Sequence, residues 1–154
     1  MYKDRVEMDV ALALNDEFKF QEKIQDTWGV LLLPMLGKYS SLDYKISLPE
    51  TPLVVGYIEL KCRTIASTTF SDTMIDMTKW NAIQDLYTKI RPNNIYIGFR
   101  FTDKDMYYLY KPEDQKRIIF RENSGPNKKR GYPDTKTTIG IPMDLLSEIK
   151  KEHK

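Results

Sequence analysis

The fold of this chain is decided by one alternating stretch, Leu53-Val54-Val55-Gly56-Tyr57-Ile58-Glu59-Leu60-Lys61-Cys62. Successive side chains of a strand point to opposite faces, so the stretch predicts a strand with two different faces. The face expected to fill a core carries Val54, Ile58, Leu60 and Cys62. The other face carries Tyr57, Glu59, Lys61 and Arg63. A carboxylate and an ammonium group therefore stand side by side next to the core, and this placement requires an explanation.

A second strand is predicted immediately before this one, over residues 41–48. It alternates in the same way, with Leu42, Tyr44, Ile46 and Leu48 on one side and Asp43 on the other. The turn Pro49-Glu50-Thr51-Pro52 would join the two strands as a hairpin. In that hairpin Asp43 and Glu59 can converge.

The length and composition indicate one soluble domain. A chain of 154 residues is long enough for one real core and too short for two ordinary ones, so residues 1–154 are expected to form a single domain. No apolar stretch reaches the length needed to span a membrane, and the N-terminus does not resemble a signal peptide. We therefore expect a cytoplasmic protein without a membrane partner. The net charge of +2 is only mildly basic, so charge alone does not identify a partner.

Two residue counts narrow the chemistry. Cys62 is the only cysteine, which excludes intramolecular disulfides and suggests a small buried apolar residue in a reducing compartment. His153 is the only histidine and lies next to the C-terminus, which argues against Ser-His-Asp and Cys-His catalysis and against Cys/His zinc sites. What remains is the chemistry of carboxylates and lysines.

Two helices are predicted around the hairpin. The first runs from about residue 16 to residue 28, with Asn15 as its cap. The apolar run 30–33 that follows is either a strand or a buried turn. The second helix begins after Asp76 or Thr78 and ends near Ile90. On it Lys79 shares a stripe with Ile83, Leu86 and Ile90, which places a lysine on the side facing the core.

The C-terminal half is predicted to contain a hairpin, two further strands and a helix. Residues 95–101 alternate and turn at 102–105 into the strand 106–110. A short strand at 118–120 precedes a loop from Glu122 to Asp134 that contains Lys128, Lys129 and Arg130. A strand at 137–141 then leads to a helix opened by Pro142, with Leu145, Leu146 and Ile149 facing inward.

The pattern acid-x-Lys is too common in this charged chain to be informative alone. The strongest competitor to Glu59/Lys61 is Asp134 with Glu148 and Lys150, but the latter two fall in the predicted C-terminal helix, where residues two apart point in different directions. Only Glu59 and Lys61 combine strand periodicity, an apolar surrounding and a partner acid on the preceding strand.

This arrangement resembles the PD-(D/E)XK nuclease superfamily, the restriction-endonuclease-like fold that includes phage and archaeal Holliday-junction resolvases. The family order is a helix with an acid, a hairpin with Asp and Glu-x-Lys, a helix and a further strand. Here the order corresponds to Glu22, Asp43, Glu59/Lys61, the helix of Lys79 and residues 95–101. Small phage-encoded members look similar over residues 71–79, where a lysine opens the second helix. Leu42 departs from the pattern by replacing the proline common before the aspartate.

The resemblance implies an α/β fold with a mixed sheet flanked by helices, and hydrolysis of phosphodiester bonds in DNA with Mg²⁺ or Mn²⁺. Asp43, Glu59 and the backbone carbonyl of Leu60 would bind the metal, since Mg²⁺ prefers a few carboxylates with water and substrate oxygens. Lys61 would position the attacking water or stabilise charge on the phosphate, or deprotonate the water; the first two roles are favoured. Glu22 would reach the metal through water or hold a second ion, with Glu17 and Asp26 as the other candidates. Lys79 would contact a phosphate at the helix N-terminus. A phage-encoded protein would act in the host cytoplasm.

Other interpretations stay open at this stage. Glu59 and Lys61 could form an ordinary ion pair at a sheet edge, and Lys79 could be an ordinary helix lysine. The protein could be a catalytically inactive module of this fold that binds nucleic acid or a protein. A small-molecule enzyme is less favoured because the chain has no Gly-rich phosphate loop. The basic loop 128–130 could follow a phosphate backbone or be merely solvated, and residues 2–14 could mediate a homodimer.

Overall fold

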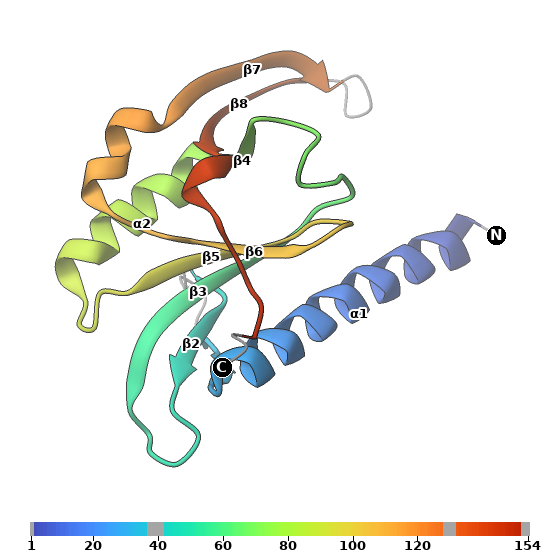
Figure 1. The fold of residues 1–154 in the computed structure, drawn as a ribbon. Coiled ribbons are helices and arrows are strands. Elements are labelled where there is room, and N and C mark those ends of the chain that lie inside the picture. Colours follow the sequence, from blue (N-terminus) through green and yellow to red (C-terminus); the bar gives the residue numbers. More distant parts are fainter. Residues whose placement is uncertain (1, 37–41, 128–131, 152–154) are drawn as a thin grey trace.

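The computed structural model describes residues 2–36, 42–127 and 132–151 and shows a mixed α/β architecture. Helix α1 (Tyr2–Trp28) packs on one face of a six-stranded sheet, and helix α2 (Met77–Lys89) packs on the other (Figure 1). A smaller three-stranded sheet lies on the same side as α2. The prediction of a mixed sheet flanked by helices is confirmed.

The six-stranded sheet is mainly antiparallel. In spatial order its strands are β1 (Leu31–Pro34), β2 (Tyr44–Ser47), β3 (Val54–Cys62), β5 (Ile95–Arg100), β6 (Asp105–Leu109) and β9 (Ser147–Glu148). Only β3 and β5 pair in parallel, with Glu59 opposite Ile97. A parallel pair needs a long crossover connection, and here the connection contains α2.

The three-stranded sheet is built from segments far apart in the sequence. Its strands are β4 (Asp72–Asp76), β8 (Tyr132–Pro142) and β7 (Ile119–Asn127), in that order. Two short 3₁₀ helices accompany it, η1 (Pro112–Arg117) before β7 and η2 (Met143–Leu145) after β8. Strand β4 runs directly into α2, so this sheet is tied to the N-terminus of that helix.

Two apolar clusters fill the two sides of the large sheet. On the α1 side Phe20 and Ile24 of the helix meet Ile58 and Leu60 of β3. On the α2 side one cluster contains Ile75, Ile139 and Ile141 of the small sheet together with Trp80 of α2 and residues of β5. Because this cluster is shared by both sheets, they form one domain.

Most elements near the predicted site are confirmed. Strands β2 and β3 form the expected antiparallel hairpin, and β5 and β6 form the second one. Helix α2 begins after Asp76, one of the two caps considered. The open question at residues 30–33 is settled in favour of a strand, β1, which pairs with β2.

The predicted start of α1 is wrong. The helix begins at Tyr2 rather than near residue 16, so Asn15 lies inside it and is not a cap. The residues ahead of Asn15 contain neither Gly nor Pro, and nothing in them stops a helix. The helix ends as expected at Trp28, where Gly29 takes up a left-handed conformation with φ 65 and its N–H donates to the carbonyl of Gln25.

The C-terminal third differs more from the prediction. Most of the loop expected over residues 122–134 is strand, because β7 pairs with β8 along its whole length, from Ile119/Gly140 to Asn127/Tyr132. Lys128, Lys129 and Arg130 lie outside the described residues. The helix expected after Pro142 is also wrong: a single 3₁₀ turn leads to β9, which pairs with β6. Leu146 and Ile149 are nevertheless buried, as predicted.

Two smaller points complete the comparison. Cys62 is exposed rather than buried, because it is the last residue of β3. Neither α1 nor α2 is both long and apolar enough to span a membrane, and the same holds for every helix in the described ranges.

Candidate active site

The centre of the candidate site is the buried carboxylate of Glu59 on β3. Glu59 is only 4% exposed, and its side chain lies on the face of the sheet that α2 covers. Its two oxygens contact two different ammonium groups. Nζ of Lys61 is 3.6 Å from Oε1, and Nζ of Lys79 is 3.3 Å from Oε2. A charge buried this deeply requires such partners.

Asp43 immediately precedes β2 and lies beside Glu59. Tyr44 pairs with Ile58, so continuing the antiparallel register by one residue sets Asp43 opposite Glu59. Oδ2 of Asp43 accepts a hydrogen bond of 2.9 Å from the backbone N–H of Leu60. This bond holds the Asp43 carboxylate against the Glu59-Leu60 peptide.

The electrostatics of Glu59 show that the two carboxylates interact. Burial raises the pKa of the Glu59 carboxyl, and the negative charge of Asp43 raises it further. Lys79 and Lys61 act in the opposite direction without cancelling the effect. The net rise comes first from burial and second from Asp43, so the ionised form of Glu59 is disfavoured and a further cation or a proton at this carboxylate would be favoured.

Lys79 occupies the position predicted from the helical stripe. It lies in the first turn of α2, its side chain is about one quarter exposed, and it donates a hydrogen bond to Oε2 of Glu59. Lys61 extends from β3 on the same face as Glu59 and is about one third exposed. The structure thus brings Asp43, Glu59, Lys61 and Lys79 together, as the sequence predicted.

Glu22 does not join them. It is exposed on α1 and lines a surface groove with Lys19, Lys23 and Asp26. The acid of α1 that faces the site is Glu17, whose pKa is raised by burial and by the charge of Asp43, and lowered by Lys61. Residues 17, 20 and 24 share one side of a helix, whereas Glu22 is turned about 140° away from Glu17. The buried stripe of Phe20 and Ile24 is the signal that could have identified Glu17.

Asp43 and Glu59 are the two carboxylates of the site that could share a divalent ion, since they lie close enough for the charge of one to act on the other. In the described parts of the chain no three acid, histidine or cysteine side chains gather closely enough to hold an ion by themselves. Mg²⁺ is usually bound through one or two carboxylates, with water and substrate oxygens in its other positions. The raised pKa of Glu59 beside Asp43 agrees with this, since a divalent cation would relieve the repulsion between the two groups.

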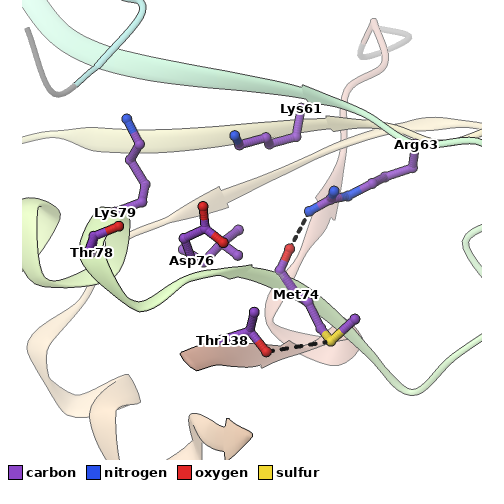
Figure 2. Close-up of a pocket in the computed structure, with 8 residues that line it drawn as sticks. Lys61, Arg63, Met74, Asp76, Thr78, Lys79 and Thr138 are labelled. Carbon is purple, nitrogen blue, oxygen red and sulfur yellow. Dashed lines mark hydrogen bonds between the residues drawn. The ribbon is translucent and has the colours of Figure 1, made fainter. Parts of the chain in front are cut away.

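A basic pocket that the sequence did not reveal opens next to Glu59. It has a volume of about 310 Å³ and lies between β3, β4, β8 and the start of α2. Figure 2 shows Lys61 and Arg63 extending from β3 on one wall and Asp76 and Thr78 on the other, with Lys79 at one end. Arg63 donates a hydrogen bond to the backbone carbonyl of Met74. The alternation of β3 places Arg63 on the Lys61 face, but the opposite wall depends on β4, which was not among the predicted strands.

Comparison of the chain with protein-family models, with curated proteins and with solved structures finds no match.

Proposed function

We propose that this protein is a metal-dependent nuclease that hydrolyses phosphodiester bonds in DNA. The observation that carries the proposal is the convergence of Asp43 with the buried Glu59, next to Lys61 and a pocket lined by cations. This combination provides oxygen ligands for a hard divalent ion and positive charge for a phosphate.

Each residue has a distinct role in the proposed reaction. Bound Mg²⁺ or Mn²⁺ would lower the pKa of a water molecule and neutralise charge on the phosphate. Asp43 and Glu59 would hold the ion, with the Leu60 carbonyl as a further ligand implied by the family resemblance. Lys61 would position the attacking water and stabilise the negative charge that develops on the phosphate oxygens. Lys79 would bind a phosphate from the first turn of α2.

The order of elements also supports the proposal. A helix with an acid, a hairpin with Asp43 and Glu59/Lys61, the helix of Lys79 and a strand parallel to β3 follow one another along the chain. The PD-(D/E)XK nuclease superfamily, which the sequence resembles, has this order. We assign the role of the α1 acid to Glu17 rather than to Glu22.

The test is a cleavage assay on labelled DNA structures with Mg²⁺, Mn²⁺ and chelator. We expect Lys61→Ala to reduce metal-dependent cleavage by about 10²-fold or more while the protein stays folded, because transition-state stabilisation by one charged donor is typically of this size. Lys89→Ala is the matched control, since Lys89 is an exposed lysine paired with Asp85 at the far end of α2. A Lys61→Ala protein that cuts at the wild-type rate would remove Lys61 from the mechanism.

One observation favours a second candidate, a nuclease-like module that binds nucleic acid or a protein without cutting. Both oxygens of Glu59 already contact lysine ammonium groups, so the carboxylate is partly satisfied without a metal. Calorimetry with Mn²⁺ separates the two candidates. Heat of binding that disappears in Glu59→Gln supports the nuclease, whereas no heat combined with tight DNA binding in chelator supports the module.

A homodimer through residues 2–14 and a cytoplasmic location stay predictions. The structure does not describe the side chains of residues 1–13. Measuring the oligomeric state in solution would test whether residues 2–14 form a dimer surface.

A further inference from the structure

A second pocket adjoins the basic pocket on the side away from Glu59. It has a volume of about 170 Å³, and the side chains at its mouth and walls include Phe70, Asp72 and Arg121. Arg63 and Met74 line both pockets, so the two are neighbours that share a wall. We call the second one the Phe70 pocket.

The basic pocket has the chemistry of a phosphate site. Lys61, Arg63 and Lys79 line it together with the carboxylate of Asp76. Lys61 and Lys79 also contact Glu59, so Arg63 is the lining cation that Glu59 does not pair with. Arg63 is held in place between the Met74 carbonyl and the ring of Phe99, 5.7 Å from its guanidinium carbon. Among the described residues no salt bridge within 4.0 Å involves Arg63, although the charge of Asp76 acts on it, and Arg63 lines both pockets, which places its guanidinium where an anion at their junction would meet it.

The Phe70 pocket differs in chemistry from the basic pocket, because it presents an exposed aromatic ring to solvent rather than a group of cations. Phe70 is 61% exposed although it lines a pocket. Asp72 is buried, and its Oδ2 lies 2.7 Å from the guanidinium of Arg121, which fixes that planar group in the pocket. The guanidinium of Arg121 and the exposed ring of Phe70 offer flat surfaces on which a nucleobase can stack.

We infer that the Phe70 pocket accepts an unpaired nucleobase of a DNA strand whose phosphates lie in the basic pocket. The inference rests on the proposed function, from which it takes DNA as the substrate. Bases inside a duplex are already stacked and cannot place a face on Phe70 without leaving the helix, which costs free energy. The preferred substrate is therefore DNA with a single-stranded segment next to the cleavage point.

The test is the affinity for labelled oligothymidine and for a blunt duplex, measured by fluorescence anisotropy in chelator. Wild-type protein binds the single strand more tightly than the duplex. Phe70→Ala weakens single-strand binding about ten-fold or more, as loss of one stacked base requires, and Phe70→Trp keeps the affinity. Phe18→Ala is the matched control, because Phe18 is a similarly exposed phenylalanine on α1. Equal affinity of Phe70→Ala and wild type, or duplex binding as tight as single-strand binding, would overturn the inference.

The contribution of the basic pocket is measured in the same assay through the salt dependence. Arg63→Gln weakens binding and lowers the slope of log affinity against log salt by about one unit, because one phosphate contact is lost. Arg91→Gln, at an exposed arginine beyond the end of α2, leaves the slope unchanged. An unchanged slope in Arg63→Gln would remove Arg63 from the phosphate site.

Cleavage and binding assays together distinguish a failure of this inference from a failure of the proposed function. Single-strand binding that depends on Phe70, without cleavage by the wild-type protein in Mn²⁺, would contradict the nuclease and leave the strand-binding site in place. Cleavage of duplex and single strand alike, unaffected by Phe70→Ala, would support the nuclease and contradict the strand-binding site.

Discussion

Glu59 is a buried acid whose surroundings disfavour its charge even though two lysines contact it. Burial and Asp43 raise its pKa above the ordinary value of 4.5. Such a group destabilises the folded protein when it is ionised and is stabilised by any cation that enters the site. Its position was predictable because the alternation of a strand is a local pattern, and the apolar neighbours of Glu59 and Lys61 set this pair apart from the other acid-x-Lys pairs.

The raised pKa gives a prediction for stability against pH. The folded state binds more protons than the unfolded state between pH 4.5 and the folded pKa of Glu59, so the free energy of unfolding falls as the pH rises through that range. Glu59→Gln lacks this contribution. Urea denaturation without metal should show the variant gaining stability relative to wild type as the pH rises from about 4 to about 8.

The difference between the two proteins should level off above the folded pKa. Glu17 also titrates with a raised pKa, but it is present in both proteins and cancels from the difference. A stability difference that stays constant with pH would contradict the raised pKa of Glu59.

At the scale of the element, the phase of α1 determines which acid meets the site. Phe20 and Ile24 are fully buried against the sheet, and Glu17 lies on the same stripe one turn earlier. A polar contact also holds this helix near the edge strand β1: the side-chain oxygen of Gln25 accepts a 2.9 Å hydrogen bond from the Leu32 N–H. The acid could have been identified from helical periodicity, and the full length of α1 from the absence of Gly and Pro ahead of Asn15.

Glu17 and Glu22 offer a matched comparison on one helix. We expect Glu17→Gln to weaken Mn²⁺ binding several-fold, because the Glu17 charge acts on Asp43. Glu22→Gln should change it less than about two-fold, since Glu22 lines a separate groove on the surface. Calorimetry with both variants measures this, and an equal or larger effect at Glu22 would restore the original assignment.

The close contact of α1 with the sheet depends on Gly98 of β5. A Cβ atom at this position would lie 3.0 Å from the ring of Phe20 and 3.1 Å from a methyl group of Leu60. Gly98→Ala should therefore lower the free energy of unfolding by about 1–3 kcal/mol, as overpacking of a core does. Urea denaturation gives the value, and a variant as stable as wild type would show that α1 adjusts its position freely.

At the scale of the whole molecule, the two sheets share one core. Ile75, Ile139 and Ile141 of the small sheet are buried in the same cluster as Ile95 and Phe99 of the large sheet. Separating the two sheets would expose this apolar cluster to water. The candidate site also depends on the packing of the two sheets, because the basic pocket has β3 on one wall and β4 and β8 on the other.

A substitution in this core should destabilise the entire protein. Ile139→Ala is expected to cost about 2–5 kcal/mol, the usual range for removing a buried isoleucine side chain beyond Cβ. Trp28 on α1 and Trp80 on α2 lie in the clusters on opposite faces of the large sheet, so their fluorescence and the circular dichroism should change in a single transition. Separate transitions would show that the small sheet unfolds on its own.

The sequence predicted the two central hairpins of the large sheet, but it missed β9 of that sheet and β4 of the small sheet. The hairpin β2–β3 and the hairpin β5–β6 join neighbouring segments, so their patterns are complete within a short stretch. Strand β4 is short and pairs with β8, a segment far along the chain. Asp72, for example, pairs with Pro142. Pairing between such distant segments leaves no local pattern, and for this reason Arg63 and Phe70 were not recognised as lining residues.

The single cysteine gives the molecule a natural attachment point for a spectroscopic label. Cys62 is exposed at the end of β3, one residue beyond Lys61. Partial burial raises the pKa of its thiol, and the charges of Asp16 and Glu17 on α1 raise it further, so the thiol should react with maleimides or methanethiosulfonates more readily at mildly alkaline pH. A fluorophore or nitroxide placed there without any mutation would report whether α1 moves when an ion or an oligonucleotide is added.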